Sequence, residues 1–147
     1  MNNGRTELYL SLGSNLGDRE KNVALAISRL DASFGVRRKA LSPLAYTEPV
    51  GFKGEIFVNA VVLYEVDMAR FPALKVLRIC KGIEKSLGRI DRPEYDAEGH
   101  RIYHDRIIDI DILRYGTLCL DTPRLTIPHP HLAERPFFTE MMDALER

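Results

Sequence analysis

Residues 106–113 read Arg-Ile-Ile-Asp-Ile-Asp-Ile-Leu, and this stretch decides the fold more than any other. Successive side chains of a β-strand point to opposite faces, so Ile108, Ile110 and Ile112 share one face while Asp109 and Asp111 share the other. Aspartate is unfavourable in strands, and a solvated acidic face is the simplest explanation for the pair. A functional role is the alternative, because residues that break a local structural rule often lie at functional sites.

The segments around this strand predict the order strand, helix, strand, strand, helix, strand. Apolar residues recur at helical spacing from Val23 to Phe34 and again from Val76 to Leu87, whereas the other segments are rich in Val and Leu over strand lengths. This order is that of the split βαβ, ferredoxin-like arrangement, so we expect an α+β fold, an antiparallel sheet with helices packed on it. The expected strands cover 8–12, 39–46, 57–66 and 106–114, and the expected helices run from the N-cap Asp18 to Gly35, from Pro72 to Gly88, and over 139–146.

Length and composition predict a single domain spanning residues 1–147. The 21 basic residues balance 21 acidic ones, which argues against a general binder of nucleic acid or of anionic membranes. The longest apolar runs are strand-sized, so we expect no membrane span. Cys80 and Cys119 form no metal-binding spacing, and we expect two free thiols in a cytoplasmic protein. The sequence carries no signal for the oligomeric state.

The stretch Gly13-Ser-Asn-Leu-Gly17 lies between an expected strand and an expected helix, where a phosphate-binding loop can occur. It matches neither the Walker A pattern nor the glycine pattern of dinucleotide-binding folds. We therefore interpret it as a plain turn in which Asn15 and Asp18 cap the helix that follows.

Arginine dominates the basic residues between positions 81 and 135, where seven arginines stand against only Lys81 and Lys85. Arginine can bind phosphate oxygens in pairs, which lysine cannot do. Mg²⁺ in turn prefers one or two carboxylates together with substrate phosphates, and Asp109 with Asp111 offers such a site for one ion or two. The combination favours carboxylates that hold Mg²⁺ and arginines that bind phosphates.

The histidines allow a rival interpretation. His100 with His104 and His129 with His131 could form a zinc site, although the first pair lies in an expected loop, where its spacing fixes no common face. A non-catalytic small-molecule sensor domain on the same fold is a second rival, in which the two aspartates are merely a solvated strand face.

Aromatic and amide side chains gather in the middle of the sequence. Phe57 could stack on a flat heterocycle while Asn59 hydrogen-bonds its edge. Packing in the core explains Phe57 equally well, so the sequence leaves both roles open.

Six motifs occur in order along the chain: Leu12-Gly-Ser-Asn-Leu-Gly17, Thr47-Glu-Pro-Val-Gly51, Phe57-Val-Asn-Ala-Val61, Ile83-Glu84 with Leu87-Gly-Arg89, Arg106-x-x-Asp-Ile-Asp-Ile112, and Arg124-Leu-Thr-Ile-Pro-His129 with Glu134-Arg-Pro-Phe137. Together they resemble the 6-hydroxymethyl-7,8-dihydropterin pyrophosphokinase family, and the resemblance covers almost the whole chain. The Arg-x-x-Asp-x-Asp strand and the Pro-His and Glu-Arg block are the most specific of these motifs.

The resemblance implies a ferredoxin-like enzyme of folate biosynthesis that transfers the terminal diphosphate of ATP to the hydroxymethyl group of the pterin and releases AMP. It implies two Mg²⁺ ions held by Asp109 and Asp111, and Arg106 is a further candidate catalytic group. The substrate hydroxyl needs a base, and Asp111 is the nearest candidate. The implied pterin contacts are Thr47, Glu48, Val50, Phe57, Asn59 and Phe137. The implied ATP contacts are Glu84, Arg89, Tyr103, Arg106, Ile112, Arg124, Thr126, His129 and Arg135.

Two features depart from the family pattern. His104 and Asp105 stand where the family usually shows a small residue and proline, and Asp105 would add a third carboxylate beside Asp109 and Asp111 if the strand began that early. The loop over 90–102 is longer than usual, and we expect it to close over ATP as a lid.

Overall fold

The computed structural model describes residues 4–49, 53–89, 94–102, 106–132 and 135–145. Its main sheet has the strand order β2-β4-β1-β7, with β3 also paired to β4. The strands of this sheet are β1 (Arg5–Ser14), β2 (Ala40–Leu41), β3 (Ala45–Thr47), β4 (Phe57–Asp67) and β7 (Asp109–Tyr115). The helices are α1 (Arg19–Phe34), α2 (Ala73–Ser86) and α3 (Pro136–Leu145). Two small hairpins are formed by β5 (Glu94–Tyr95) with β6 (Arg101–Ile102) and by β8 (Leu120–Asp121) with β9 (Thr126–Ile127).

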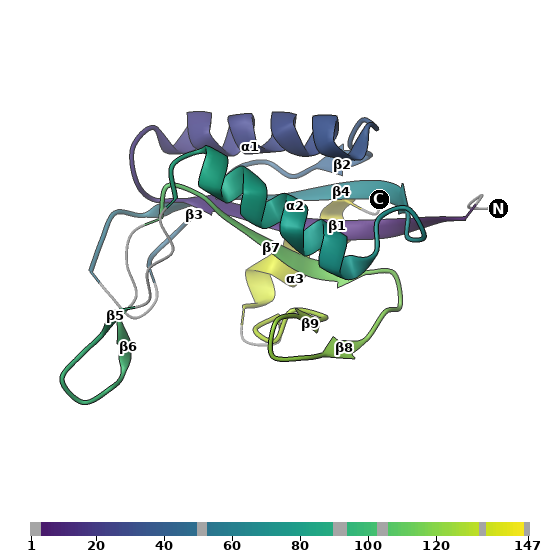
Figure 1. Ribbon diagram of the computed structural model, residues 1–147. Helices are drawn as coiled ribbons and strands as arrows, with labels where there is room; N and C mark the ends of the chain where they lie inside the picture. Colours follow the sequence, from purple (N-terminus) through teal and green to yellow (C-terminus); the bar gives the residue numbers. More distant parts are fainter. Residues whose placement is uncertain (1–3, 50–52, 90–93, 103–105, 133–134, 146–147) are drawn as a thin grey trace.

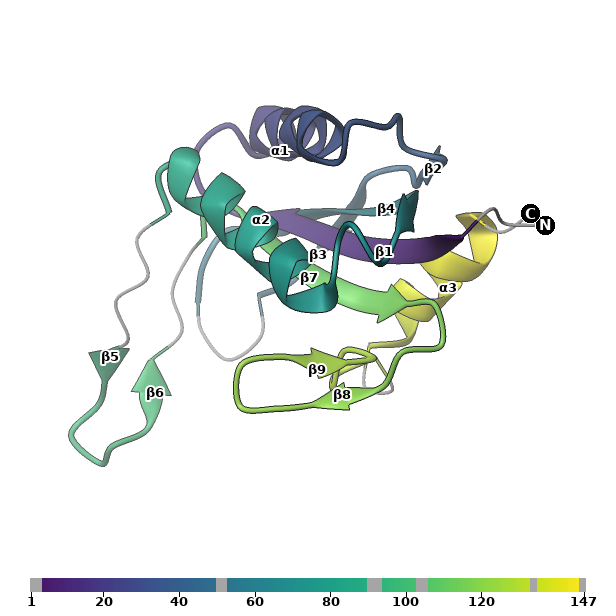
Figure 2. The same ribbon diagram turned by 45° about the vertical axis from the view of Figure 1, so that its right-hand side comes forward.

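The two long helices, α1 and α2, cover one face of the sheet, and α3 lies against the other (Figures 1 and 2). Every strand pairing in this sheet is antiparallel, and β1 runs between β4 and β7. The predicted α+β, ferredoxin-like fold class is therefore confirmed. The strand that carries the two aspartates, β7, lies at one edge of the sheet.

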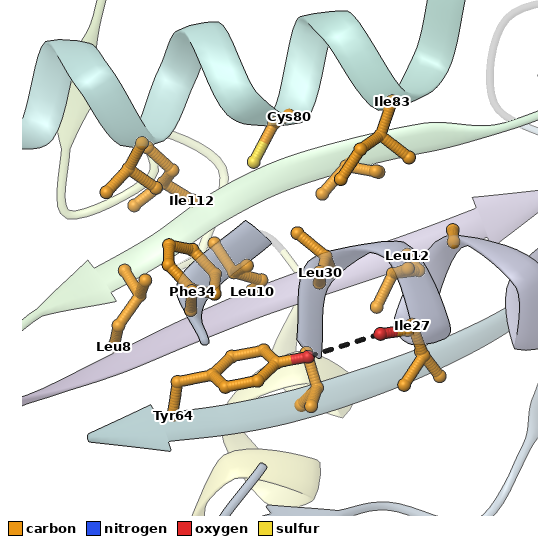
Figure 3. Close-up of a cluster of buried hydrophobic side chains, with 14 of the residues drawn as sticks. Leu8, Leu10, Leu12, Ile27, Leu30, Phe34, Tyr64, Cys80, Ile83 and Ile112 are labelled. Atoms are coloured by element: carbon orange, nitrogen blue, oxygen red, sulfur yellow. Dashed lines mark hydrogen bonds between the residues drawn. The ribbon is translucent and has the colours of Figure 1, made fainter. Parts of the chain in front are cut away.

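The larger hydrophobic core fills the space between the sheet and the helices α1 and α2 (Figure 3). Leu30 of α1 and Cys80 of α2 belong to it together with Leu10 and Ile112 of the strands. A smaller core on the opposite face joins α3 to the sheet through Met142. Alternate residues of the central strands thus pack against different layers, which explains why these strands are apolar on both faces.

Several elements differ from the sequence prediction. The expected strand over 39–46 is split into β2 and β3, because Pro43 between them has no backbone N–H for a strand pairing. The long segment after Arg89 contains the β5–β6 hairpin, and the β8–β9 hairpin was not predicted. Helix α3 begins at Pro136, three residues before the expected start, since proline suits the first turn of a helix.

Local signals at the first helix are confirmed in part. The Asp18 carboxylate accepts the backbone N–H of Lys21 at 3.2 Å and caps α1, and Gly35 ends the helix with a left-handed φ of 66°. Cys80 is buried and Cys119 is exposed, and both thiols are free, as expected. In the part of the chain that the structure describes, no helix is both long and apolar enough to cross a lipid bilayer.

Candidate active site

The two aspartates of β7 occupy the sheet face opposite to α1 and α2. The intervening Ile110 and the flanking Ile108 and Ile112 are 0 to 4% exposed and belong to the main core. The Asp109 and Asp111 side chains are each 37% exposed. The predicted alternation is therefore confirmed, and both carboxylates are partly buried on the face of β7 opposite to the isoleucines.

A row of paired residues runs across three strands on this face. Gly13 of β1 pairs with Asn59 of β4 on one side and with Asp109 of β7 on the other. Side chains of directly paired residues share a face, and neighbouring strands lie about 4.8 Å apart, so Asn59 and Asp109 are separated by roughly 10 Å across the glycine. Because Gly13 has no side chain, the Asn59 amide and the Phe57 ring can lie close to its backbone.

The amide end of this row is fixed by hydrogen bonds. Asn59 is 6% exposed, and its Nδ2 donates to Thr47 Oγ1 at 2.7 Å. A Cβ atom added to Gly13 would lie 3.0 Å from Asn59 Oδ1 and 3.5 Å from a ring carbon of Phe57. Thr47, Phe57 and Asn59, which the sequence assigned to one ligand, are thus neighbours around Gly13. Gly13 was expected to begin a turn, but it lies inside β1, where a glycine is a known signal of a close approach.

The carboxylate end of the row is held from outside the sheet by Glu84 and Arg89. Glu84 Oε2 accepts the backbone N–H of Ile110 at 2.7 Å and an Arg89 N–H at 2.9 Å. Arg89 Nη1 also lies 2.8 Å from Asp109 Oδ1 and 3.3 Å from the carbonyl oxygen of Ile108. Backbone groups at the open edge of β7 are therefore satisfied by two side chains in place of a further strand.

Glu84 is a buried carboxylate, and only one of its two oxygens accepts hydrogen bonds from the described residues. Its side chain is 1% exposed, and burial raises its pKa, an effect that the Arg89 guanidinium and the Ile110 N–H oppose. Its second oxygen, Oε1, accepts no hydrogen bond from the described residues, although Lys81 Nζ lies 3.4 Å away as an ion-pair partner. The carboxylate is consequently oriented toward Arg89 and the strand, and Lys81 joins the charged cluster without having been predicted.

Asp111 faces a histidine. His129 Nε2 lies 3.8 Å from Asp111 Oδ2, and the His129 backbone N–H donates to the Leu113 carbonyl at 2.9 Å. The backbone N–H of His131 donates to His129 Nδ1 at 3.1 Å, so the neutral imidazole carries its proton on Nε2, facing Asp111. Burial, with the charges of His131 and Arg135, lowers the pKa of His129 and favours this neutral form.

The carboxylate pair has the electrostatics of a cation site. Burial and the adjacent Asp109 carboxylate raise the pKa of Asp111 well above its ordinary value, with Glu84 adding to the effect. Two carboxylates that disfavour each other's ionisation are stabilised by a bound cation, and partly exposed carboxylate oxygens are the donors that Mg²⁺ prefers. The donor set therefore fits Mg²⁺.

The predicted zinc alternative finds less support. His104 lies outside the described residues, and His129 Nδ1 is engaged by a backbone N–H. Among the residues that the structure describes, one group of three metal-ligating side chains approaches a common point: the exposed Asp96, Glu98 and His100 on the β5–β6 turn. Among the described residues, this group contains a single histidine, His100.

The remaining predicted contacts come from several segments of the chain. Ile112 is a special case, because its side chain lies in the main core (Figure 3), and only its backbone at the edge of β7 can meet a ligand. Val50, Tyr103 and Asp105 lie outside the described residues. Arg106 precedes β7, and Glu48 follows β3. Thr126 is the first residue of β9, and Arg124 lies two residues before it. Arg135 precedes α3, and Phe137 lies in its first turn.

Asn15 does not have the role that the sequence suggested. It was expected to help cap α1, but its side chain binds two distant segments, at Glu55 and Arg106. Asp18 alone provides the side-chain cap. Because a buried amide can hydrogen-bond in any direction, the position of Asn15 before a helix was compatible with capping but did not establish it.

Comparison with known proteins is consistent with this site. The family described as 7,8-dihydro-6-hydroxymethylpterin-pyrophosphokinase matches residues 9–147. A 2-amino-4-hydroxy-6-hydroxymethyldihydropteridine pyrophosphokinase of Porphyromonas gingivalis is 39% identical over 132 residues, which cover 88% of this chain and 84% of the relative. A Bacillus subtilis protein of the same name is 31% identical over 88% of this chain and 71% of its own. The folic acid synthesis protein fol1 of Schizosaccharomyces pombe is 36% identical over 93% of this chain, which corresponds to 17% of that longer protein.

Proposed function

The chain belongs to the 7,8-dihydro-6-hydroxymethylpterin-pyrophosphokinase family, and we propose that it transfers the terminal diphosphate of ATP to the hydroxymethyl group of 6-hydroxymethyl-7,8-dihydropterin, releasing AMP, in folate biosynthesis. The row Asn59, Gly13, Asp109 carries this proposal. It offers an amide for a heterocycle and a carboxylate for a metal–phosphate complex on one face, roughly 10 Å apart.

In the proposed pterin half, the ring lies beside Gly13, between Phe57 and Phe137. Asn59 is oriented by Thr47 and can hydrogen-bond the edge of the heterocycle. Phe57 next to Gly13 and the half-buried Phe137 at the start of α3 supply aromatic surface for stacking. Glu48 and Val50 complete the proposed set of pterin contacts, all taken from the family resemblance.

In the proposed ATP half, arginines bind the phosphates. Arg89 is oriented by Glu84 so that its guanidinium lies beside Asp109, where a metal-bound phosphate would meet it. Arg106 enters from the segment before β7. The other proposed ATP contacts are Tyr103, the backbone of Ile112, Arg124, Thr126, His129 and Arg135.

Two Mg²⁺ ions held by Asp109 and Asp111 would neutralise the phosphate charge that develops during transfer. The protein's own contribution is positioning and charge. Asn59 and the aromatic groups hold the hydroxymethyl carbon in place, and the arginines fix the diphosphate. Asp111 is the proposed acceptor of the hydroxyl proton, and the neutral His129 beside it can donate a hydrogen bond to the carboxylate or to a phosphate oxygen.

We further propose that residues 1–147 act as one domain and that the enzyme works in the cytoplasm. The free thiols of Cys80 and Cys119 support a reducing compartment.

The test is release of AMP from ATP in the presence of Mg²⁺ and 6-hydroxymethyl-7,8-dihydropterin, followed by chromatography of the nucleotides. We expect AMP in amounts equal to the pyrophosphorylated pterin, and neither product when the pterin is omitted or Mg²⁺ is chelated. A sensor domain would instead bind the pterin without forming AMP. Absence of pterin-dependent AMP from folded protein would refute the proposed activity.

A further inference from the structure

Asn15 is a buried polar residue in the loop between β1 and α1. It is 1% exposed, although it lies in a short polar turn at the sheet end that carries the candidate site. A fully buried amide must find partners for both its donor and its acceptor. Asn15 hydrogen-bonds to two segments that are far apart in the sequence and that flank the candidate site.

The first of these segments precedes β7. The backbone N–H of Asn15 donates to the Arg106 carbonyl at 3.0 Å, and the Arg106 backbone N–H donates to Asn15 Oδ1 at 2.7 Å. These two hydrogen bonds use both backbone groups of Arg106, so they fix its main chain in position and orientation. Arg106 is the residue to which the proposed function assigns a phosphate contact.

The second segment leads into β4. Asn15 Nδ2 donates to the Glu55 carbonyl at 3.1 Å, two residues before Phe57. Arg19 of α1 supports the same segment, because its Nη1 donates to the Ile56 carbonyl at 2.7 Å. The contact of Asn15 therefore helps to set where β4 begins, and with it the position of Phe57 on the pterin side of the row.

Asparagine suits this position because one planar amide offers a donor and an acceptor in fixed relative orientation. A serine or alanine would lose at least one of the two connections. An aspartate would keep an acceptor for Arg106 but would face the Glu55 carbonyl with an oxygen.

From these contacts we infer that Asn15 is a positioning residue for both substrates, aligning Arg106 on the ATP side and Phe57 on the pterin side through a single amide. This inference rests on the proposed function, which supplies the roles of Arg106 and Phe57. Misplacement of reacting groups by about 1 Å can reduce rates on the order of 100-fold, so a residue that touches neither substrate can still control turnover.

The test compares Asn15→Ala with Asn22→Ala as a matched control. Asn22 of α1 is an amide bound to the same loop, because its Nδ2 donates to the Leu16 carbonyl at 2.9 Å and to Ser14 Oγ at 3.3 Å, and these hydrogen bonds reach neither Glu55 nor Arg106. Dissociation constants are measured by calorimetry for the Mg²⁺ complex of a non-hydrolysable ATP analogue and, separately, for the pterin. The steady-state rate of AMP release is measured alongside.

We expect Asn15→Ala to weaken binding of both ligands about tenfold or more and to lower kcat on the order of 10- to 100-fold. The control should stay within about threefold of the wild-type protein for every constant, whatever its melting temperature. A purely structural role for Asn15 predicts that both variants lose thermal stability alike while their binding and turnover stay alike. That result, or an effect of Asn15→Ala on only one ligand, would overturn the inference.

Asn15→Asp gives a second measurement, and it decides the matter if the alanine variant does not fold. Because Oδ1 is retained for Arg106, affinity for the ATP analogue should stay within about threefold, while affinity for the pterin falls by roughly tenfold. Equal losses of affinity for both ligands, or no loss for either, would contradict the assignment of Oδ1 to the ATP side and of Nδ2 to the pterin side. Wild-type protein that binds neither ligand would instead refute the proposed function itself.

Discussion

Replacement of Gly13 by alanine tests the central feature of the site, the glycine that lies between Asn59 and Asp109 in the sheet. The new Cβ would lie 3.0 Å from Asn59 Oδ1 and 3.5 Å from a ring carbon of Phe57. A separation of 3.0 Å is tighter than an ordinary contact, so the Asn59 amide must move by a few tenths of an ångström. That movement strains its 2.7 Å hydrogen bond to Thr47.

The free energy of unfolding should change only moderately. Overpacking of a well-packed site costs about 1–3 kcal/mol, and the reduced entropy of the unfolded chain offsets about 0.4–1 kcal/mol of this. The net loss of about 0–2.6 kcal/mol corresponds to a fall in Tm of roughly 0–10 °C for a chain of this size. The effect on pterin binding should be larger, because the methyl group occupies the surface on which the ring is proposed to lie and also displaces Asn59.

The assay is steady-state AMP release with each substrate varied in turn. Gly13→Ala should raise the KM for the pterin about tenfold or more while the KM for ATP changes less than about threefold. Gly82→Ala in α2 is the matched control: its Cβ meets nothing within 4 Å, so it should stabilise the helix by about 0.5–1 kcal/mol and leave both KM values unchanged. An unchanged pterin KM in a folded Gly13→Ala protein would refute the placement of the ring.

Three further predictions concern the charged face and the hairpin. Asp111→Asn should lower turnover by at least about 100-fold, and near-normal turnover would exclude Asp111 from the mechanism. The melting temperature of the metal-free protein should stay equal or rise, because the substitution removes a carboxylate whose ionisation its neighbours oppose. Burial and Asp109 raise the pKa of Asp111, so its carboxyl keeps the proton to a higher pH than an ordinary aspartate does. The apparent Mg²⁺ affinity should therefore weaken as pH falls through that raised pKa, and more Mg²⁺ should shift the acidic limb of the pH–activity profile to lower pH. An acidic limb that does not respond to Mg²⁺ would contradict this prediction. Replacement of residues 95–101 of the β5–β6 hairpin by a short Gly-Ser linker should reduce kcat much more than it reduces Tm, as expected for a lid, and an unchanged kcat measured by AMP release would argue against that role.

The fold was predictable because its signals are local and periodic. Two amphipathic helices, four apolar strand segments and their order along the chain were sufficient for the ferredoxin-like class. The strand with Asp109 and Asp111 was predictable for the same reason, since alternation assigns side chains to faces without knowledge of the neighbouring strands. The predicted element boundaries were wrong near two prolines: Pro43 lies between β2 and β3, and Pro136 begins α3.

The site was predictable only as a set of residue types. Asp109, Asn59 and Arg89 were named from sequence, but nothing in the sequence says that Gly13 stands between the first two, because strand register depends on contacts across the sheet. The hydrogen-bond partners of Asn15 could not be predicted from the sequence for a related reason. A side-chain hydrogen bond that spans 91 residues, as the one to Arg106 does, leaves no periodic trace.

The position of β7 at the edge of the sheet links the fold of this protein to its proposed chemistry. Central strands bury their backbone groups in pairings on both sides, whereas β7 has a partner on one side only and must satisfy its outer groups in another way. It does so with charged and polar residues: Glu84 accepts from Ile110, and Arg89 donates to Ile108. The same two side chains fix the charge environment of Asp109. A strand in the middle of the sheet could not present its backbone and two carboxylates to such partners, so the position of the aspartates at the sheet edge is itself a condition for the proposed chemistry.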